Sequence, residues 1–489
     1  MSAQTEAQRT ACPPLPSLAE RTAFIPTAQE FAQAYRGMAA FRFLKAFLRC
    51  SEPELERVMA KIYCDSLPEN YGNNESYAES LLKALGHPWR YLIGTSFLWR
   101  KTRPVHIDLE ITDRNYFEER YRRVFDRLPG PKRLTPLDRG SFSGSGVELA
   151  SWINDSVSPR CLFWLFLAPL FAPSLWLLSR RLGQNVLAYY RKSLGIYASF
   201  DGHFCRHPCR HFITYADESN HPCRLIAFRQ NCAGKLFVVQ NGERTHHPVY
   251  AFGAVDVYLS FGPYMDNLCR ELRIEGRVIP VGALNLDRFF KLHQGLAPEK
   301  PIYDLLFIDQ SIWPYNDFDA ATGRSLDLLF QRVGELKRRN PGWRVAYQMR
   351  NYRDPARTRE IVDHVRRLMG PEIEILPNTG KGESYLNIHR SRLVISFNST
   401  LAYEAFFFGK GVKALFVNFA RNPYEIYSDD ARFQHYDPSG DYDRLKAKVW
   451  ELLALELGQP PEAARQRHLD FDGRVQDRLA QAILGEISA

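Results

Sequence analysis

Two different patterns of apolar positions divide the chain. In residues 1–142 the apolar side chains recur mainly at helical spacing, as Phe41, Leu44 and Leu48 do on one face of a predicted helix. From about residue 183, short apolar runs of strand length alternate with helical stretches. We therefore predict a mainly helical N-terminal region followed by α/β structure.

The α/β part contains two series of predicted strands, which we expect to form Rossmann-like domains at residues 183–290 and 300–489. Parallel strands need crossover connections, so this alternation predicts two parallel sheets with helices on both faces and a cleft between the domains. The first series comprises Ile196–Phe200, Phe212–Tyr215, Leu225–Phe228, Leu236–Val239, Val257–Phe261 and Val278–Val281. The second comprises Tyr303–Ile308, Trp343–Met349, Ile373–Leu376, Leu393–Phe397 and Lys413–Val417, followed by helices at Asp441–Leu457 and Pro461–Ile487.

A long uncharged stretch, Cys161–Ser179, interrupts the soluble pattern within the predicted linker, residues 143–182. It is long enough to cross a bilayer and is bounded by arginines. Pro169 and Pro173 would each interrupt a helical ladder. Three interpretations therefore stay open: a helical hairpin that dips into the cytoplasmic leaflet, a hairpin buried in the core, and a membrane span.

The charge balance favours an anionic partner. Lys and Arg number 64 against 55 Asp and Glu, which gives a net charge of +9. The basic residues are dispersed and not interleaved with aromatic side chains, so we expect no nucleic acid as partner. The motifs GxGxxG, Walker A, HExxH and GxSxG do not occur, which argues against nicotinamide enzymes, P-loop ATPases, zincins and serine hydrolases.

The cysteines and the N-terminus bear on the compartment. Nine cysteines are an odd number and thinly spread, unlike a secreted disulfide framework. The first residues contain no apolar segment typical of a secretory signal. We expect a cytoplasmic protein that is peripheral to the inner face of the plasma membrane.

Polar residues that follow the predicted strands are the candidates for chemistry, because ligands of open parallel sheets bind beyond the carboxyl ends of the strands. They are Asn241 and Glu243, Asp309 and Gln310, Arg350, Asn351 and Arg353, and Asn398, Ser399 and Thr400. The last three lie between a strand and a helix, where backbone N–H groups and hydroxyls favour a bound phosphate. Glu404, in the first turn of that helix, would accept hydrogen bonds from a ribose. Plain helix capping by Ser399 or Thr400 is the alternative.

Several of these segments resemble a known family. Ile395–Thr400 with Glu404, followed by Gly409-Lys410 and Leu415–Asn418, resembles the nucleotide-sugar half of GT-B glycosyltransferases that build bacterial lipopolysaccharide and capsule. Val238–Glu243 and Leu305–Gln310 are similar to segments of the retaining β-Kdo transferases, which use CMP-Kdo. The resemblance covers about residues 185–430, and it implies a GT-B-like fold and an enzyme of cell-envelope polysaccharide biosynthesis.

For the reaction, the resemblance implies double displacement with Asp309 as nucleophile and Glu243 as acid/base. The donor would be CMP-Kdo or another nucleotide sugar, and the acceptor a glycan or a lipid-linked sugar. A donor with one phosphate needs no metal, because Arg350 or Arg353 can neutralise it. For both acids a plain structural role, in loop capping or in a solvated turn, stays open.

Two alternatives to Kdo transfer stay open. One is a transferase with another donor. The adjacent His246 and His247 are compatible with a glycerophosphotransferase that uses CDP-glycerol, and a UDP-sugar donor also stays open. A non-catalytic scaffold tethered to the membrane is the other.

Alternating His and Cys residues would share one face of an extended strand and suggest a metal site. Pro208 interrupts them, however, and no Cys-x-x-Cys pair accompanies them, so we expect no metal. They are His203, Cys205, His207, Cys209 and His211.

Overall fold

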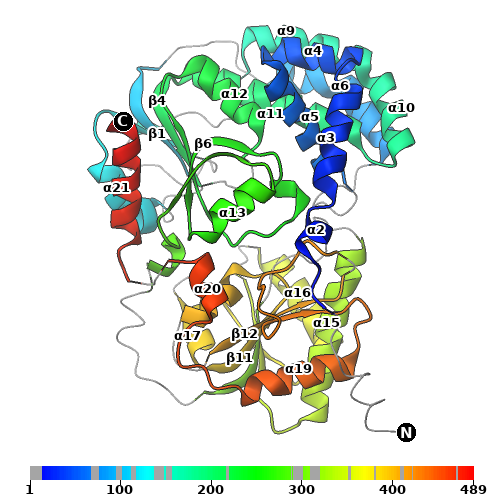
Figure 1. Cartoon of the computed structure of the whole chain (residues 1–489), viewed down its shortest axis with the longest axis vertical. Helices are drawn as coiled ribbons and strands as arrows, with labels where there is room; N and C mark the ends of the chain where they lie inside the picture. The colour runs from blue at the N-terminus through cyan, green and yellow to red at the C-terminus, as the bar shows by residue number, and fades with distance from the viewer. Residues whose placement is uncertain are drawn as a thin grey trace. The chain divides into compact units, whose positions relative to one another are not determined.

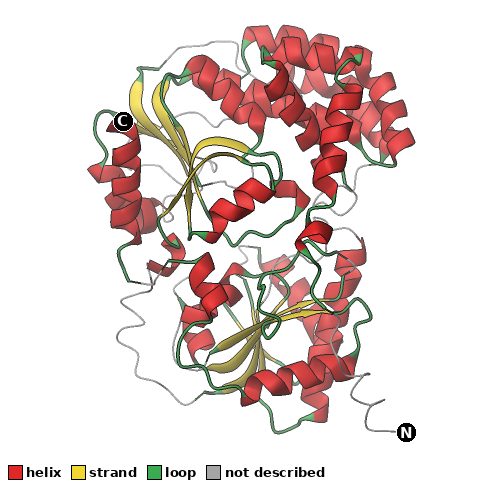
Figure 2. Cartoon of the chain, in the orientation of Figure 1, coloured by secondary structure: helices red, strands yellow, loops and turns green. Residues whose placement is uncertain are grey.

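The chain divides into two compact units, each built on one sheet (Figures 1 and 2). The N-sheet unit comprises Thr22–Asn241, His247–Arg288 and Asp472–Ala489, and the C-sheet unit comprises Met1–Arg21, Gly242–His246 and Phe289–Phe471. The computed structural model describes residues 14–67, 76–94, 102–111, 117–136, 148–149, 157–215, 220–287, 289, 301–308, 320–350, 354–378, 382–407, 412–420, 422–469 and 472–488.

The sheet of the N-sheet unit has seven strands in the order β3-β2-β1-β4-β5-β6-β7, all paired in parallel. The strands are β1 Val105–Ile111, β2 Lys132–Pro136, β3 Glu148–Leu149, β4 Cys209–Thr214, β5 Leu236–Val239, β6 Ala254–Ser260 and β7 Glu275–Pro280. Strands β1 and β2 lie within residues 1–142, so the region predicted as mainly helical also contributes to the first sheet, which the sequence pattern did not indicate.

Helices cover the first sheet and extend into an N-terminal bundle. They are α3 Phe24–Tyr35, α4 Ala39–Leu48, α5 Glu52–Asp65, α6 Tyr77–Gly94, η1 Phe117–Tyr121, α8 Arg122–Arg127, α9 Pro159–Leu167, η3 Ala168–Phe171, α10 Ala172–Leu182, α11 Val186–Arg206, α12 Pro222–Asn231, η5 Pro248–Tyr250, α13 Tyr264–Glu271 and α21 Val475–Ser488. The predicted strands Ile196–Phe200 and Leu225–Phe228 are wrong, since they lie inside α11 and α12. Both helices are largely buried, and a short apolar run does not distinguish a buried helix from a buried strand.

The apolar stretch is one continuous helical run, Pro159–Leu182, formed by α9, η3 and α10. Pro169 and Pro173 occupy the first turns of η3 and α10, where a missing N–H is tolerated. The predicted hairpin is therefore wrong. By length and composition the run could cross a membrane.

The sheet of the C-sheet unit has six parallel strands in the order β10-β9-β8-β11-β12-β13. They are β8 Tyr303–Ile308, β9 Val345–Gln348, β10 Glu374–Leu376, β11 Ser391–Ser396, β12 Lys413–Asn418 and β13 Gln434–Tyr436. The helices are α2 Leu18–Arg21, α15 Ala320–Arg339, α16 Pro355–Met369, α17 Glu383–His389, α18 Thr400–Glu404, η6 Ala405–Phe407, α19 Tyr442–Ala454 and α20 Glu462–Arg467. The predicted α/β fold class is confirmed, with two Rossmann-like parallel sheets and additional N-terminal helices.

The predicted C-terminal helix Pro461–Ile487 is wrong at its centre, because it is split into α20 and α21. Gly473 lies between them with a φ of 73°, a conformation that favours glycine and ends helical geometry. Helix α21 belongs to the N-sheet unit, where Val475, Leu479 and Ile483 join the core beneath the first sheet (Figure 1). Helix α21 therefore belongs to the same unit as strands β1 to β7, although the C-sheet unit lies between them in sequence.

Candidate active site

A buried carboxylate, Glu243, is the centre of a polar cluster in the C-sheet unit. It follows β5 in sequence, but its segment Gly242–His246 belongs to the C-sheet unit. One oxygen accepts a hydrogen bond from Arg467 Nη1 at 2.7 Å, and the other lies 2.8 Å from His468 Nε2. We name Glu243, Thr400, Tyr403, Arg467 and His468 the Glu243 cluster.

Two elements bring the partners of Glu243 into place. Arg467 is the last residue of α20 and His468 follows it directly. Thr400 is the first residue of α18, and its Oγ1 accepts a hydrogen bond of 2.7 Å from the backbone N–H of Glu243. The acidic residue is therefore tied down through both its side chain and its backbone.

Aromatic rings and a glycine complete the packing. The His468 ring stacks on Tyr403 and Phe407, at centroid distances of 4.8 and 5.4 Å. A Cβ at Gly242 would lie 2.8 Å from a guanidinium nitrogen of Arg244 and 3.1 Å from Thr400 Oγ1. A side chain at Gly242 would therefore require Arg244 and Thr400 to shift.

The cluster stabilises a negative charge. Glu243, Arg467 and His468 are all nearly fully buried. Burial alone would raise the pKa of Glu243, but the hydrogen bond and charge of His468, together with the charge of Arg467, outweigh it and lower the pKa. The carboxylate is therefore ionised at neutral pH, which suits proton acceptance better than proton donation.

The cluster lies near the carboxyl ends of two neighbouring strands. Strands β8 and β11 pair in parallel. At their ends Ser396 Oγ donates to the carbonyl of Ile308 at 3.3 Å and accepts from the N–H of Ser399 at 3.2 Å. The residue after Ile308 is Asp309, the predicted nucleophile. It lies outside the described residues, but the strand that leads to it ends beside the turn that carries Thr400.

The other predicted residues of this turn lie close by. Ser399 is buried at the N-cap position of α18 but forms no capping hydrogen bond with its side chain, so the plain capping alternative is wrong for Ser399. Asn398 is partly buried. Glu404 is buried, and Tyr385 on α17 donates to its Oε2 at 2.9 Å. Its predicted contact with a ribose stays a prediction.

The remaining candidates are placed less fully. Arg350 is exposed two residues beyond the end of β9, and Asn241 is partly buried directly before Gly242. Four predicted residues lie outside the part of the chain that the structure describes: Asp309, Gln310, Asn351 and Arg353.

The alternating His and Cys residues do not share a strand. His203 and Cys205 lie on α11, whereas Cys209 and His211 lie on β4. Within the described ranges no three His, Cys, Asp or Glu side chains form a group that could hold a metal ion. His246 and His247, the residues behind the CDP-glycerol alternative, are both buried, and His247 caps η5 by accepting from the N–H of Val249.

Sequence reasoning missed Arg467 and His468. They are 224 and 225 residues from Glu243 and were assigned to the interior of one predicted helix. The turn-forming residues Asp470-Phe-Asp-Gly473 were the available signal that the helix ends there. Recognising that break would have placed both side chains at a helix terminus.

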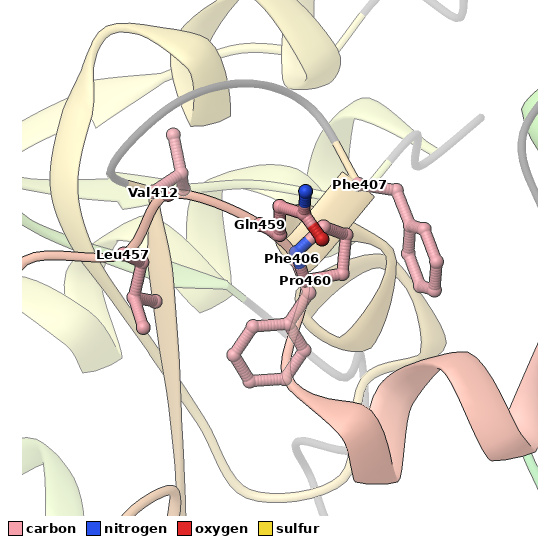
Figure 3. A pocket seen from close by; sticks show the side chains of 7 residues that line it. Phe406, Phe407, Val412, Leu457, Gln459 and Pro460 are labelled. Carbon is pink, nitrogen blue, oxygen red and sulfur yellow. The ribbon is translucent and has the colours of Figure 1, made fainter.

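An apolar hollow of about 210 Å³ adjoins the cluster. Phe407 lines the hollow and also stacks on His468, and its ring is turned away from that of Phe406 (Figure 3). The lining is mostly apolar, so the hollow suits an apolar group better than a nucleotide. Its lining residues are Phe406, Phe407, Val412, Leu457, Gly458, Gln459 and Pro460.

No family model and no curated protein sequence matches the chain. Among solved structures, a UDP-GlcNAc 2-epimerase from Methanocaldococcus jannaschii is 10% identical, with a TM-score of 0.45 over 78% of this chain and 100% of its own. A glycosyltransferase from Rickettsia africae is 12% identical, with a TM-score of 0.41 over 79% and 95%. The wall teichoic acid polymerase TagF, solved with CDPG, is 11% identical, with a TM-score of 0.39 over 92% and 98%.

Proposed function

We propose that this protein is a glycosyltransferase that moves a sugar from a nucleotide-linked donor to a glycan or lipid-linked acceptor. The observation that carries the proposal is the buried, ionised Glu243 near the carboxyl ends of β8 and β11, where parallel sheets bind their ligands. The resemblance of Val238–Glu243 and Leu305–Gln310 to retaining Kdo transferases supports CMP-Kdo as the donor.

The proposed reaction has two displacements. First, a carboxylate oxygen of Asp309 attacks the anomeric carbon of Kdo, and the bond from that carbon to the phosphate oxygen breaks, so that CMP leaves with the electron pair. Second, an acceptor hydroxyl attacks the same carbon, its proton passes to Glu243, and the bond to Asp309 breaks. The anomeric configuration is inverted twice and so retained.

The state of Glu243 sharpens its role in this scheme. A phosphate ester leaves as a stable anion, so the first step needs no proton donor. The second step needs a base, and Glu243 is held ionised by Arg467 and His468. We therefore propose Glu243 as a general base and not as the acid/base that the resemblance implied.

The test is the intact mass of the protein after incubation with CMP-Kdo. In Glu243→Gln the second step is slow, so we expect CMP release and an added mass of one Kdo residue. The added mass should be absent in Asp309→Ala. Asp437→Asn changes another buried carboxylate of the same unit, one bonded to Ser439 and Arg444; it is the matched control and should turn over without accumulating the adduct.

A different result would redirect or overturn the proposal. If Asp309→Ala releases CMP at the wild-type rate and no adduct forms in Glu243→Gln, double displacement is wrong. A thermal-shift panel with CMP-Kdo, UDP-sugars and CDP-glycerol separates the donors, since the donor that binds raises Tm by mass action. Stabilisation by none of them would favour the non-catalytic scaffold.

A further inference from the structure

Large apolar side chains are exposed together on one group of helices in the N-sheet unit. Among the described residues, six of the eight exposed large apolar side chains belong to α6, α9, η3 and α10. Helix α6 packs against the other three. We name these six the apolar face: Leu82 (71% exposed), Leu85 (48%), Phe163 (63%), Phe166 (40%), Leu170 (73%) and Leu177 (62%).

The opposite side of the run Pro159–Leu182 is fixed to the unit. Cys161, Leu165, Leu175 and Leu178 are buried at helical spacing, and the run packs against α4, α6 and α11. At its start Ser158 Oγ donates to the buried Asp201 at 2.6 Å. A span of the bilayer would surround the run with lipid and break these contacts, so the packing favours a run that lies on a surface over one that crosses a membrane.

The charges within the run and its sequence flanks have one sign. Residues 156–200 contain five basic and no acidic side chains. Arg180 and Arg181 are exposed at the end of α10, and neither forms an ion pair within the described part of the chain. The Arg180 guanidinium lies 5.1 Å from the ring centroid of Trp176. Apolar side chains bordered by tryptophan and arginine match the boundary between acyl chains and anionic headgroups.

We propose that the apolar face, with Arg180 and Arg181 at its edge, docks on the surface of an anionic lipid bilayer. The leucines and phenylalanines enter the acyl boundary while the arginines contact lipid phosphates. A second copy of this chain would bring the same positive charges together, which disfavours it as the occupant. The inference does not depend on the proposed chemistry.

Vesicle flotation of the full chain tests this docking. The wild type should float with vesicles of phosphatidylcholine mixed with phosphatidylglycerol, and much less with phosphatidylcholine alone. Leu170→Glu with Leu177→Glu should weaken binding by at least about tenfold. Arg180→Gln with Arg181→Gln should weaken binding to the anionic vesicles only, by about fivefold per arginine.

Matched controls keep the outcome decisive. Leu18→Glu changes an exposed leucine of the C-sheet unit and should float like the wild type. Equal Tm values show that the variants are folded. Docking is overturned if Leu170→Glu with Leu177→Glu binds vesicles as the wild type does. It is also overturned if the wild type binds no vesicles but is a dimer that this variant converts to a monomer.

Discussion

Each unit buries a carboxylate beside an arginine, a histidine and a threonine, but at different places relative to its sheet. In the N-sheet unit Asp108 accepts from Arg133 Nε at 2.9 Å and from Thr135 Oγ1 at 2.7 Å, and lies 3.7 Å from His203 Nε2. We name these four residues the Asp108 cluster. In the C-sheet unit the corresponding group is the Glu243 cluster.

The position decides what each cluster can do. Asp108 lies in the middle of β1, in register with Arg133 on β2, and His203 comes from the covering helix α11. Asp108 therefore lies within the sheet and under a helix, away from the strand ends where ligands of parallel sheets bind. Glu243 lies near the carboxyl ends of β8 and β11, the place where ligands of parallel sheets bind. The same set of side chains thus stabilises the fold in one unit and is proposed to carry chemistry in the other.

The largest expected effect is on stability, in the N-sheet unit. Arg133→Met removes the guanidinium that donates to Asp108, to Thr102 Oγ1 and to the carbonyl of His207. Breaking a buried ion pair in this way should lower the free energy of unfolding by about 3–5 kcal/mol. Urea denaturation measures the loss. Sugar transfer per folded molecule should stay unchanged, and a specific loss of transfer would contradict the comparison.

The next effect concerns the pH dependence of transfer. Arg467→Met removes the positive charge that lies beside the Glu243 carboxylate and should raise the pKa of that carboxyl. Less of the base is then ionised in mild acid, so the acidic limb of the pH–rate profile should move to higher pH. Arg467→Lys keeps the charge and should move it less, and Arg133→Met should not move it. An unchanged profile in Arg467→Met would exclude Glu243 as the base.

Acid should weaken the N-sheet unit more steeply. Burial is the main cause that lowers the pKa of three histidines there: His207 to about 3, His211 to about 4, and His221. In the C-sheet unit it lowers the pKa of two, His364 and, to about 4, His435. Between an ordinary pKa of 6.5 and these values, only the unfolded chain binds the proton, so stability falls as pH falls. Each histidine contributes at most about 1.4 kcal/mol per pH unit.

Amide hydrogen exchange at about pH 7 and about pH 5, corrected for intrinsic rates, measures the loss of stability on acidification. Strand β4 reports on the N-sheet unit and β11 on the C-sheet unit. The slowest amides of β4 should lose more protection than those of β11, and His211→Gln should reduce that loss. Equal losses in both strands would show that the buried histidines do not set the difference.

The smallest effects should come from the two threonines. Thr135→Val removes a donor to Asp108, and Thr400→Val removes the acceptor of the Glu243 N–H, each at a cost of about 1 kcal/mol. Only Thr400→Val should also slow sugar transfer, because it loosens the loop that holds Glu243. Thr400→Ser should restore the rate. A slower rate in Thr135→Val would remove the distinction between the clusters.

The sequence pattern predicted most of the second sheet but only part of the first. Tyr303–Ile308 and Leu236–Val239 were predicted with the bounds that the structure shows, because each is a short, mostly apolar run that ends at a polar residue. Strand β1 was missed. Its Asp108 and Glu110 alternate with apolar residues yet are buried, and the partner that neutralises Asp108 is distant in sequence. Burial of that kind leaves no local signal.

The candidate site was predictable to a similar extent. Glu243 and Thr400 follow predicted strands, and the structure joins them by a hydrogen bond of 2.7 Å. Arg467 and His468 were not predictable from the rule of strand ends, because they follow a helix. Their approach to Glu243 depends on the path of the last part of the chain, which short-range periodicity does not encode.

The return of α21 to the N-sheet unit has a consequence for synthesis. During translation the C-sheet unit leaves the ribosome before α21 does, so the first sheet waits without the side chains of Val475, Leu479 and Ile483 that complete its core. Its apolar surface beneath β1 and β4 stays open for that time. The nascent protein should therefore be a chaperone client until its last helix docks, although most of its first unit was made much earlier.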